Sequence, residues 1–260
     1  MKPFRKDVWL DESSPLICSG VPRWKRVLDV TCILLALPML VFLGLFIAIG
    51  IKILSRGPVL FKQERVGFRG KRFNCLKFRT MTMDADTSVH QTHLSKLINS
   101  NLPMVKLDLE GDARVIPLGW LIRSTGLDEL PQVINVLRGE MSLVGPRPCL
   151  PYEHESYQPR HKERCETLPG LTGLWQVTGK NNTTFEEMMD LDIWYARNKS
   201  LWLDLEIIFK TIPAVFMLGQ EMRRIVKRNQ QRHFFSPLPA RPVHQSSSSE
   251  QLFRANDRNR

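Results

Sequence analysis

The longest apolar stretch of the chain runs from Val30 to Ile51 and carries no charged residue. A helix rises about 1.5 Å per residue, so a stretch of this length is sufficient to cross the hydrocarbon core of a bilayer. Pro38 lies inside the stretch, where its ring would clash with the carbonyl of the preceding helical turn. The pattern therefore predicts a membrane-inserted helix over residues 23–54 that is kinked at Pro38.

The two ends of this helix carry similar charge. Basic residues stand on both sides of the apolar stretch, and they are Arg23, Lys25, Arg26, Lys52, Arg56, Lys62 and Arg65. Because positive charge marks the cytoplasmic end of a membrane helix, this symmetry does not choose between the ends. A re-entrant helix with both ends on the cytoplasmic face fits the symmetry, and a helix that spans the bilayer is the alternative.

A second hydrophobic pattern lies in residues 122–148. Its apolar residues recur with helical spacing, and they are Leu127, Leu130, Val133, Ile134 and Leu137. Gly139 stands where a helix would end, and Pro131 is tolerated in a first turn, where its missing N–H loses no partner. We therefore predict a short amphipathic helix that begins with the adjacent acids Asp128 and Glu129.

Shorter patterns predict a hairpin and two further helices. Residues 59–61 and 72–76 are typical of short strands, with Gly67 and Gly70 in the connection. Residues 183–216 have helical spacing and place four aromatics among basic residues, namely Trp194, Tyr195, Trp202 and Phe209. These helices lie at a membrane interface, or they bury the aromatics in a core, and the pattern leaves both open.

The composition narrows the class of partner. The net charge of +11 and the pI near 9.7 indicate an anionic partner, which could be nucleic acid, acidic lipid or a phosphorylated substrate. Charge alone does not choose among these three. The five cysteines are scattered without CxxC spacing, which is typical of a reducing compartment and argues against a disulfide framework or a zinc site.

The candidate chemistry lies around the two adjacent acids. Asp128 and Glu129 follow Arg123 and precede Arg147, which stands in the stiff sequence Gly-Pro-Arg-Pro. A helix N-terminus favours a carboxylate and can also receive a phosphate, and arginine suits bidentate contact with phosphate oxygens. The alternative is that Asp128 is only a helix cap and Glu129 only a first-turn acid.

The predicted hairpin would bring two more cations toward these acids. Lys77 and Arg79 stand at the end of its second strand. They contact a phosphate group there, or they belong to a basic face that lies against anionic lipid head groups, and the sequence leaves both interpretations open.

Several motifs occur together in one order. They are Phe61 to Met81 (FKQERVGFRGKRFNCLKFRTM), Asp112 to Val115 followed by Gly119, LDELPQ, SLVGPRP, and Pro169 to Gly179 (PGLTGLWQVTG). In this order the chain resembles the monotopic phosphoglycosyl transferases, the bacterial sugar transferase family that loads undecaprenyl phosphate. The resemblance covers roughly residues 23 to 216.

The resemblance implies an α+β fold that is mainly helical. It implies a monotopic membrane protein with one kinked re-entrant N-terminal helix, interfacial amphipathic helices and a small β-hairpin. The family breaks its membrane helix at a Ser-Pro pair, where this chain has Leu37-Pro38. The expected organisation is a polar lead-in (1–22), the membrane-inserted helix (23–54), a catalytic domain on the cytoplasmic face (55–220) and a basic, disordered tail (221–260).

The resemblance also implies a reaction. Asp128 would attack the sugar-bearing phosphate of a UDP-sugar, release UMP and hold a phosphosugar that passes to undecaprenyl phosphate. Glu129 would support a metal ion or handle a proton, and Mg²⁺ would be held by a carboxylate of the pair Asp128 and Glu129. Arg147 and Arg123 would bind phosphate oxygens. This step begins exopolysaccharide, O-antigen or glycoconjugate biosynthesis.

The substrates imply the location, because a UDP-sugar is cytosolic and a polyprenyl phosphate is buried in lipid. We expect the active site on the cytoplasmic face of the bacterial inner membrane, in contact with membrane lipids and without nucleic acid, and a homodimer stays open. Two other functions remain as alternatives. One is a membrane-tethered basic binding module without catalysis, and the other is a conventional glycosyltransferase that releases UDP. The sequence does not name the sugar or the pathway.

Overall fold

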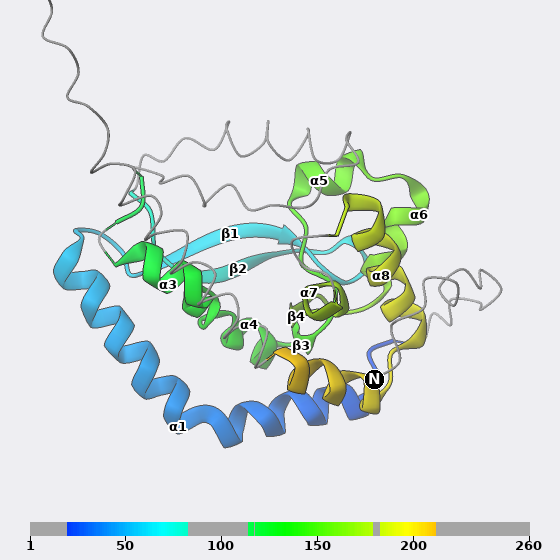
Figure 1. Cartoon of the computed structure of the whole chain (residues 1–260), viewed down its shortest axis with the longest axis horizontal. Coiled ribbons are helices and arrows are strands. Elements are labelled where there is room, and N and C mark those ends of the chain that lie inside the picture. Colours follow the sequence, from blue (N-terminus) through cyan, green and yellow to red (C-terminus); the bar gives the residue numbers. More distant parts are fainter. Residues whose placement is uncertain (1–19, 83–113, 117, 179–182, 212–260) are drawn as a thin grey trace, which may run out of the picture. The chain divides into compact units, whose positions relative to one another are not determined.

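The computed structural model describes residues 20–82, 114–116, 118–178 and 183–211 (Figure 1). The predicted lead-in and tail therefore lie outside the described residues, apart from residues 20–22. The described part consists of helices and two small two-stranded sheets. This arrangement agrees with the mainly helical α+β fold that the sequence predicts.

The apolar stretch forms one long helix, α1 (Arg23–Leu54), which contains Pro38. Figure 1 shows that α1 changes direction about halfway along its length. Among the described residues it is the one helix long and apolar enough to cross a membrane, by length and composition alone, and 11% of its most apolar window is buried. Its most exposed apolar side chains are Leu35, Phe42, Phe46 and Ile53.

The predicted hairpin is present. Strand β1 (Leu60–Val66) pairs antiparallel with β2 (Arg72–Phe78), from Leu60 opposite Phe78 to Val66 opposite Arg72. A 3₁₀ turn, η2 (Phe68–Gly70), joins the strands. The prediction ended the first strand too early, because Lys62, Gln63 and Glu64 interrupt its apolar pattern while their backbone continues the ladder.

The predicted helix at the two acids is divided into separate elements, which corrects the sequence interpretation. After α3 (Gly119–Thr125), the 3₁₀ turn η4 (Leu127–Glu129) contains both acids, and α4 (Gln132–Arg138) begins only after Pro131. Pro131 has no N–H to donate, and the chain makes a 3₁₀ bond from Leu130 to Leu127 there. The acids therefore lie before α4 and not in its first turn. The predicted end at Gly139 is confirmed, with φ of 80°.

The buried face of α4 also differs from the prediction. Ile134 and Leu137 are 40% and 39% exposed, whereas Asn135 and Val136 are fully buried. The side chain of Asn135 accepts a bond from the N–H of Leu76 at 3.0 Å and donates to the carbonyl of Asn74 at 2.8 Å. These two bonds pair backbone groups at the edge of β2 that would otherwise have no partner in the hairpin. The polar side chain of Asn135 is therefore buried, and it fixes α4 on the hairpin.

The C-terminal half of the described chain packs around a second sheet. Strand β3 (Ser142–Val144) pairs parallel with β4 (Gly170–Thr172). The helices are α5 (Pro151–Ser156), α6 (Pro159–Lys162), η5 (Glu163–Glu166), α7 (Leu174–Thr178) and α8 (Phe185–Asn198), and residues 201–211 are also helical. Tyr195 is buried, while Trp202 and Phe209 are 80% and 69% exposed, so the predicted aromatic helices serve both a core and a surface.

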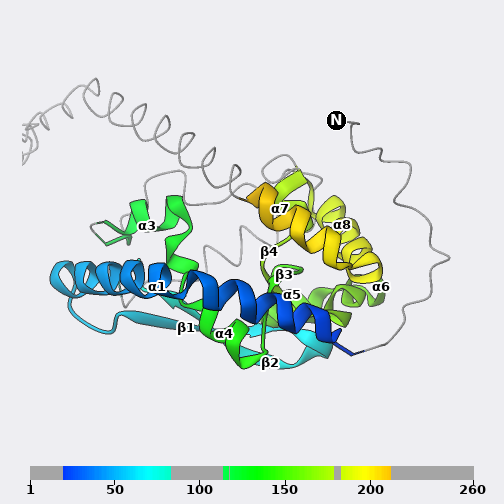
Figure 2. The same ribbon diagram turned by 90° about the horizontal axis from the view of Figure 1, so that it is seen from below.

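Polar contacts fasten the first turns of α1 to the domain. Lys25, which the sequence presents as a flanking charge, is fully buried and donates to Asp204 at 2.5 Å and to Tyr195 at 2.8 Å. Asp29 accepts bonds from the hydroxyl of Ser142 at 3.0 Å and from the N–H of Leu143. Arg26 donates to the last carbonyls of α4, which lies beside α1 in Figure 2. These contacts join α1 to β3, α4 and the helix of residues 201–211.

Candidate active site

The two acids lie in a short turn that packs on the hairpin. Gly126 has φ of 73° and redirects the chain from α3 into η4, where Asp128 and Glu129 are half-buried. The carboxylate of Glu129 pairs with the ammonium of Lys77 on β2 at 2.9 Å. The structure thus joins Glu129 to one of the cations that the sequence predicts for the site. Both side chains are partly exposed, so the pair alone adds little stability, about 1 kcal/mol or less.

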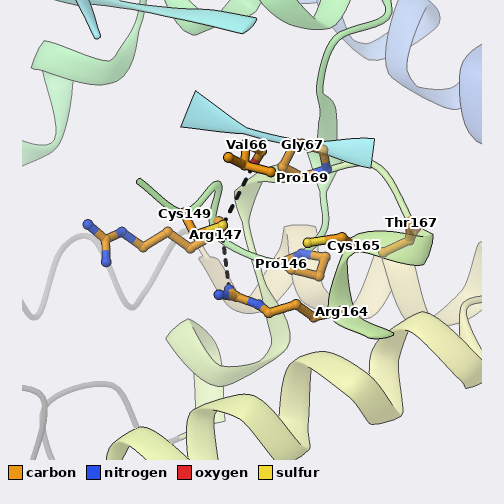
Figure 3. Close-up of a pocket in the computed structure, with 9 residues that line it drawn as sticks. All are labelled: Val66, Gly67, Pro146, Arg147, Cys149, Arg164, Cys165, Thr167 and Pro169. Atoms are coloured by element: carbon orange, nitrogen blue, oxygen red, sulfur yellow. Dashed lines mark hydrogen bonds between the residues drawn. The ribbon is translucent and has the colours of Figure 1, made fainter. Parts of the chain in front are cut away.

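Arg147 lies in the loop that follows β3. A Cβ at Gly145 would lie 2.2 Å from the carbonyl oxygen of Leu168, so this position accepts only glycine. Figure 3 shows the guanidinium of Arg147 pointing away from the pocket that its backbone helps to line. Among the residues that the structure describes, none forms an ion pair with this guanidinium. Its charge is therefore available to an anion.

Several charges converge on the buried face of the hairpin. Burial raises the pKa of the Cys75 thiol, and the negative charge of Glu129 raises it further. The positive charges of Lys77, Arg65 and Arg147 lower the same pKa. Burial also lowers the pKa of Arg65, and the nearby positive charge of Arg147 lowers it further. Such electrostatic effects weaken with distance, so the charges that cause them lie in the same part of the structure as Cys75 and Arg65. The predicted site residues Glu129, Lys77 and Arg147 thus lie in one part of the structure. Arg65, which the sequence did not indicate as a site residue, lies there as well.

The other two predicted phosphate ligands make different contacts. Arg123 on α3 is half-buried and donates to the hydroxyl of Thr80 at 3.3 Å. Arg79 is 4% exposed and donates to the carbonyl of Arg56 at 2.7 Å and to the carbonyl and hydroxyl of Ser55 at 3.1 Å. Arg79 therefore holds the end of α1, and a phosphate contact by this residue stays a prediction.

Two buried arginines are the functional candidates that sequence reasoning missed. Arg65 and Arg164 are 5% and 3% exposed, and both donate to the backbone of the Arg147 loop. Arg164 also pairs with Asp192, and burial raises the pKa of Asp192 to about 6 against the opposing effect of this guanidinium. Arg65 belongs to the FKQERVG motif, whereas no local pattern marks Arg164.

A small pocket lies behind this loop (Figure 3). It is lined by Val66, Gly67, Pro146, Arg147, Cys149, Arg164, Cys165, Thr167 and Pro169. Its empty volume of about 200 Å³ already includes space that is open to solvent, so the pocket itself is smaller than this. A nucleotide sugar therefore does not fit inside this pocket. The better candidate for its binding site is the other side of the loop, where the guanidinium of Arg147 lies.

The candidate site offers few groups for a metal ion. Within the described ranges, no three His, Cys, Asp or Glu side chains are grouped for metal binding. The adjacent carboxylates of Asp128 and Glu129 suit Mg²⁺, which commonly takes one or two protein carboxylates and completes its shell with water and substrate phosphate. The donor set thus fits a metal ion that arrives with a diphosphate.

Comparisons with known proteins identify relatives. The model of the family described as "Bacterial sugar transferase" matches residues 21–218. The chain is 40% identical over 194 residues to a galactosyl transferase of Streptococcus agalactiae and 40% identical over 191 residues to an exopolysaccharide production protein of Sinorhizobium fredii. It is 38% identical over 201 residues to an undecaprenyl-phosphate galactose phosphotransferase of Salmonella typhimurium.

The matches cover similar parts of this chain and different shares of the relatives. Each covers 74% of this chain. The matched region is 42% of the streptococcal protein and 40% of the Salmonella protein, but 84% of the rhizobial protein. The chain therefore spans less than half the length of two of these relatives, and most of the third.

Proposed function

The chain belongs to the bacterial sugar transferase family, a family of transferase enzymes, and we propose that it moves a phosphosugar from a UDP-sugar to undecaprenyl phosphate with release of UMP. The observation that carries this proposal is the half-buried carboxylate pair Asp128 and Glu129, set beside Lys77 and the charges of Arg65 and Arg147. Acids among cations suit a site that must attack a phosphate and also neutralise it. The printed name of the Salmonella relative supports the lipid acceptor.

The first step would use Asp128 as the nucleophile. A carboxylate oxygen attacks the sugar-bearing phosphorus, and a new bond forms between this oxygen and the phosphorus. The bond between the same phosphorus and the bridging oxygen of the diphosphate breaks, and UMP leaves with the electron pair. Asp128 then holds the phosphosugar as an acyl phosphate, as aspartyl-phosphate enzymes do.

The second step would regenerate the carboxylate. A phosphate oxygen of undecaprenyl phosphate attacks the phosphorus of the acyl phosphate, and the bond to Asp128 breaks. The product is a polyprenyl diphosphate sugar. Because each step replaces one phosphorus–oxygen bond with another, no oxidant or reductant is needed.

The cations would bind the diphosphate and the charge that develops on it. The guanidinium of Arg147 points away from the pocket behind its loop, Lys77 already contacts Glu129, and Arg123 lies on α3 close to the turn. Removing one preorganised positive group from such a site costs on the order of a hundredfold in rate. Mg²⁺, held by Asp128 or Glu129 together with the substrate, would supply further charge neutralisation.

We propose that α1 is re-entrant and has both ends on the cytoplasmic face. Its first half contacts β3 and α4, while Ile47 and Ile51 near its other end pack against Phe78 and Ile122. Both ends therefore contact the same domain. A straight spanning helix of this length would carry one end roughly 30 Å or more from that domain, across the bilayer. The bend near the middle and the exposed apolar side chains between the ends suit insertion into one leaflet (Figure 1).

Identification of the released nucleotide tests the proposed reaction. Purified protein in detergent is incubated with undecaprenyl phosphate, Mg²⁺ and a panel of UDP-sugars, and the nucleotide product is separated by chromatography. We expect UMP from one or few donors. UDP would instead indicate a conventional glycosyltransferase. Absence of both nucleotides, together with salt-sensitive binding to DNA, would favour a membrane-tethered binding module.

A further inference from the structure

The backbone that carries Arg147 is held at almost every carbonyl between Val144 and Cys149. The donors in order are Tyr195 Oη to Val144 O at 3.2 Å, Gly170 N to Pro146 O at 2.9 Å, Arg164 Nη2 to Arg147 O at 2.9 Å, Arg65 Nη1 to Pro148 O at 3.0 Å and Val66 N to Cys149 O at 2.9 Å. The N–H of Gly145 in turn donates to the backbone carbonyl of Thr172 at 2.9 Å. A surface loop normally leaves several of these groups to water.

Two of these donors are buried guanidinium groups on consecutive carbonyls. Arg65 comes from β1 and Arg164 from η5, so they reach the loop from separate parts of the sequence. Burying a cation is costly unless its charge and its hydrogen bonds are compensated. Arg164 is compensated by Asp192 and by the hydroxyl of Tyr157, and Arg65 by the side-chain oxygen of Gln63.

The first of these two anchored carbonyls belongs to Arg147 itself, whose side chain is half-buried. Figure 3 shows Arg164 bonded to the backbone of Arg147, while the guanidinium of Arg147 extends to the other side. A long arginine side chain can bind a phosphate in a defined geometry only if its own backbone is fixed. The two buried arginines fix the two peptide groups that follow the Arg147 Cα, on either side of Pro148, and the N–H of Gly170 fixes the peptide group before it.

We propose that Arg65 and Arg164 are positioning residues, which act on phosphate binding through Arg147 and do not touch the substrate. This inference rests on the proposed function, because it takes Arg147 as a ligand of the transferred or the leaving phosphate. It goes further by naming the residues that give Arg147 its orientation. A lysine at position 164 keeps the charge for Asp192, but one ammonium nitrogen cannot reproduce the planar fork that reaches three acceptors.

A double-mutant cycle separates positioning from general stabilisation. The variants are Arg164→Lys, Arg147→Ala and the double variant, and kcat/KM for the donor is measured from nucleotide release. We expect Arg164→Lys alone to lower kcat/KM about 10-fold to 100-fold, because a misplacement of about 1 Å can cost 10²-fold. In the Arg147→Ala background we expect the same change to cost less than about 2-fold, because the residue through which it acts is absent.

A matched control is available four residues earlier. Arg160 on α6 pairs with Asp190 on α8 at 2.7 Å, as Arg164 pairs with Asp192, but this pair is exposed and does not contact the loop. We expect Arg160→Lys to leave kcat/KM unchanged. Thermal unfolding in detergent establishes that each variant is folded, and Arg65→Lys serves as the second test if Arg164→Lys does not fold, with the same expected pattern in the cycle.

Two results would overturn the inference. One is a folded Arg164→Lys or Arg65→Lys variant with the kcat/KM of the parent. The other is a cycle in which the losses multiply, because a purely structural role lowers activity whether or not Arg147 is present. A failure of the proposed function is separate, since it would appear as UDP release, or no nucleotide release, from the unmodified protein.

Discussion

The turn that carries Asp128 and the loop that carries Arg147 are held in different ways. In the turn η4, Leu127 and Leu130 pack against the core beneath α3, and the following helix is fixed to β2 by Asn135. In the loop, the backbone carbonyls themselves are bonded, two of them to buried guanidinium groups. The comparison indicates that the carboxylates are placed by packing of their neighbours, whereas the cation is placed by a preorganised backbone.

This difference has a physical reason. An aspartate has a short side chain, so its position follows that of its own turn, and the packing of adjacent residues is sufficient to place it. An arginine reaches its ligand through a long flexible side chain, and any movement of its backbone also displaces the guanidinium. The site therefore needs a stiff backbone only under the arginine.

The largest effect is expected at the carboxylate turn. Asp128→Asn removes the proposed nucleophile and keeps its shape, so we expect loss of turnover by at least about 10³-fold with unchanged folding and membrane association. Turnover is measured as UMP release, and folding is measured by thermal unfolding. Asp190→Asn, which alters an exposed carboxylate on α8, is the control. Activity near that of the parent in Asp128→Asn would refute the covalent step.

A smaller effect is expected from the support of the turn. Asn135→Ala leaves the N–H of Leu76 and the carbonyl of Asn74 without their partner. Each buried unsatisfied group costs about 1 to 3 kcal/mol, so we expect roughly 2 to 4 kcal/mol of lost stability, and about 10-fold lower activity as η4 moves. Thermal unfolding and nucleotide release are measured together. Asn198→Ala, which removes an exposed bond to Trp194, should change neither.

If Asn135→Ala lowers stability but leaves activity intact, the turn does not depend on the docking of α4. The contrast with the loop would then need another explanation, such as placement of the acids by α3. The pair of variants at positions 135 and 198 thus separates local packing from general loss of stability.

The smallest effect concerns the support of the loop and depends on pH. Burial raises the pKa of Asp192 to about 6, and protonation would leave Arg164 without its counter-charge. We expect activity to fall a few-fold as the pH drops through about 6, and this part of the pH profile should be absent in Asp192→Asn. A profile that is identical in the two proteins would contradict this role of Asp192.

The stability change over the same pH range has the opposite sign. The folded pKa of Asp192 lies above its ordinary value of 3.8, so the folded state binds the proton more tightly than the unfolded state. This contribution is full below about 3.8 and is lost as the pH rises through about 6. We therefore expect the thermal midpoint of the parent, relative to Asp192→Asn, to rise as the pH falls from 7 to 5, while activity declines.

Much of the site could be predicted because its signals are local. Asp128 and Glu129 are adjacent, Arg147 stands in a stiff Gly-Pro-Arg-Pro loop, and Lys77 ends a strand, so each is visible in a few residues of sequence. The structure brings Lys77 to Glu129 and places Arg147 near the same buried thiol. Arg79 was predicted from the same kind of signal, yet it bonds to the end of α1, because alternation along a strand does not tell which face meets which partner.

The sequence by itself determined the elements that depend on short-range pattern, namely the length of α1, the hairpin, the end of α4 at Gly139 and the motifs that carry the acids and Arg147. Only the tertiary structure decided which polar residues are buried. Lys25 meets Asp204 across 179 positions, and Arg65 meets Pro148 across 83. A charged residue looks solvent-exposed in any local window, and only the fold supplies the distant partner that compensates the cost of burying its charge.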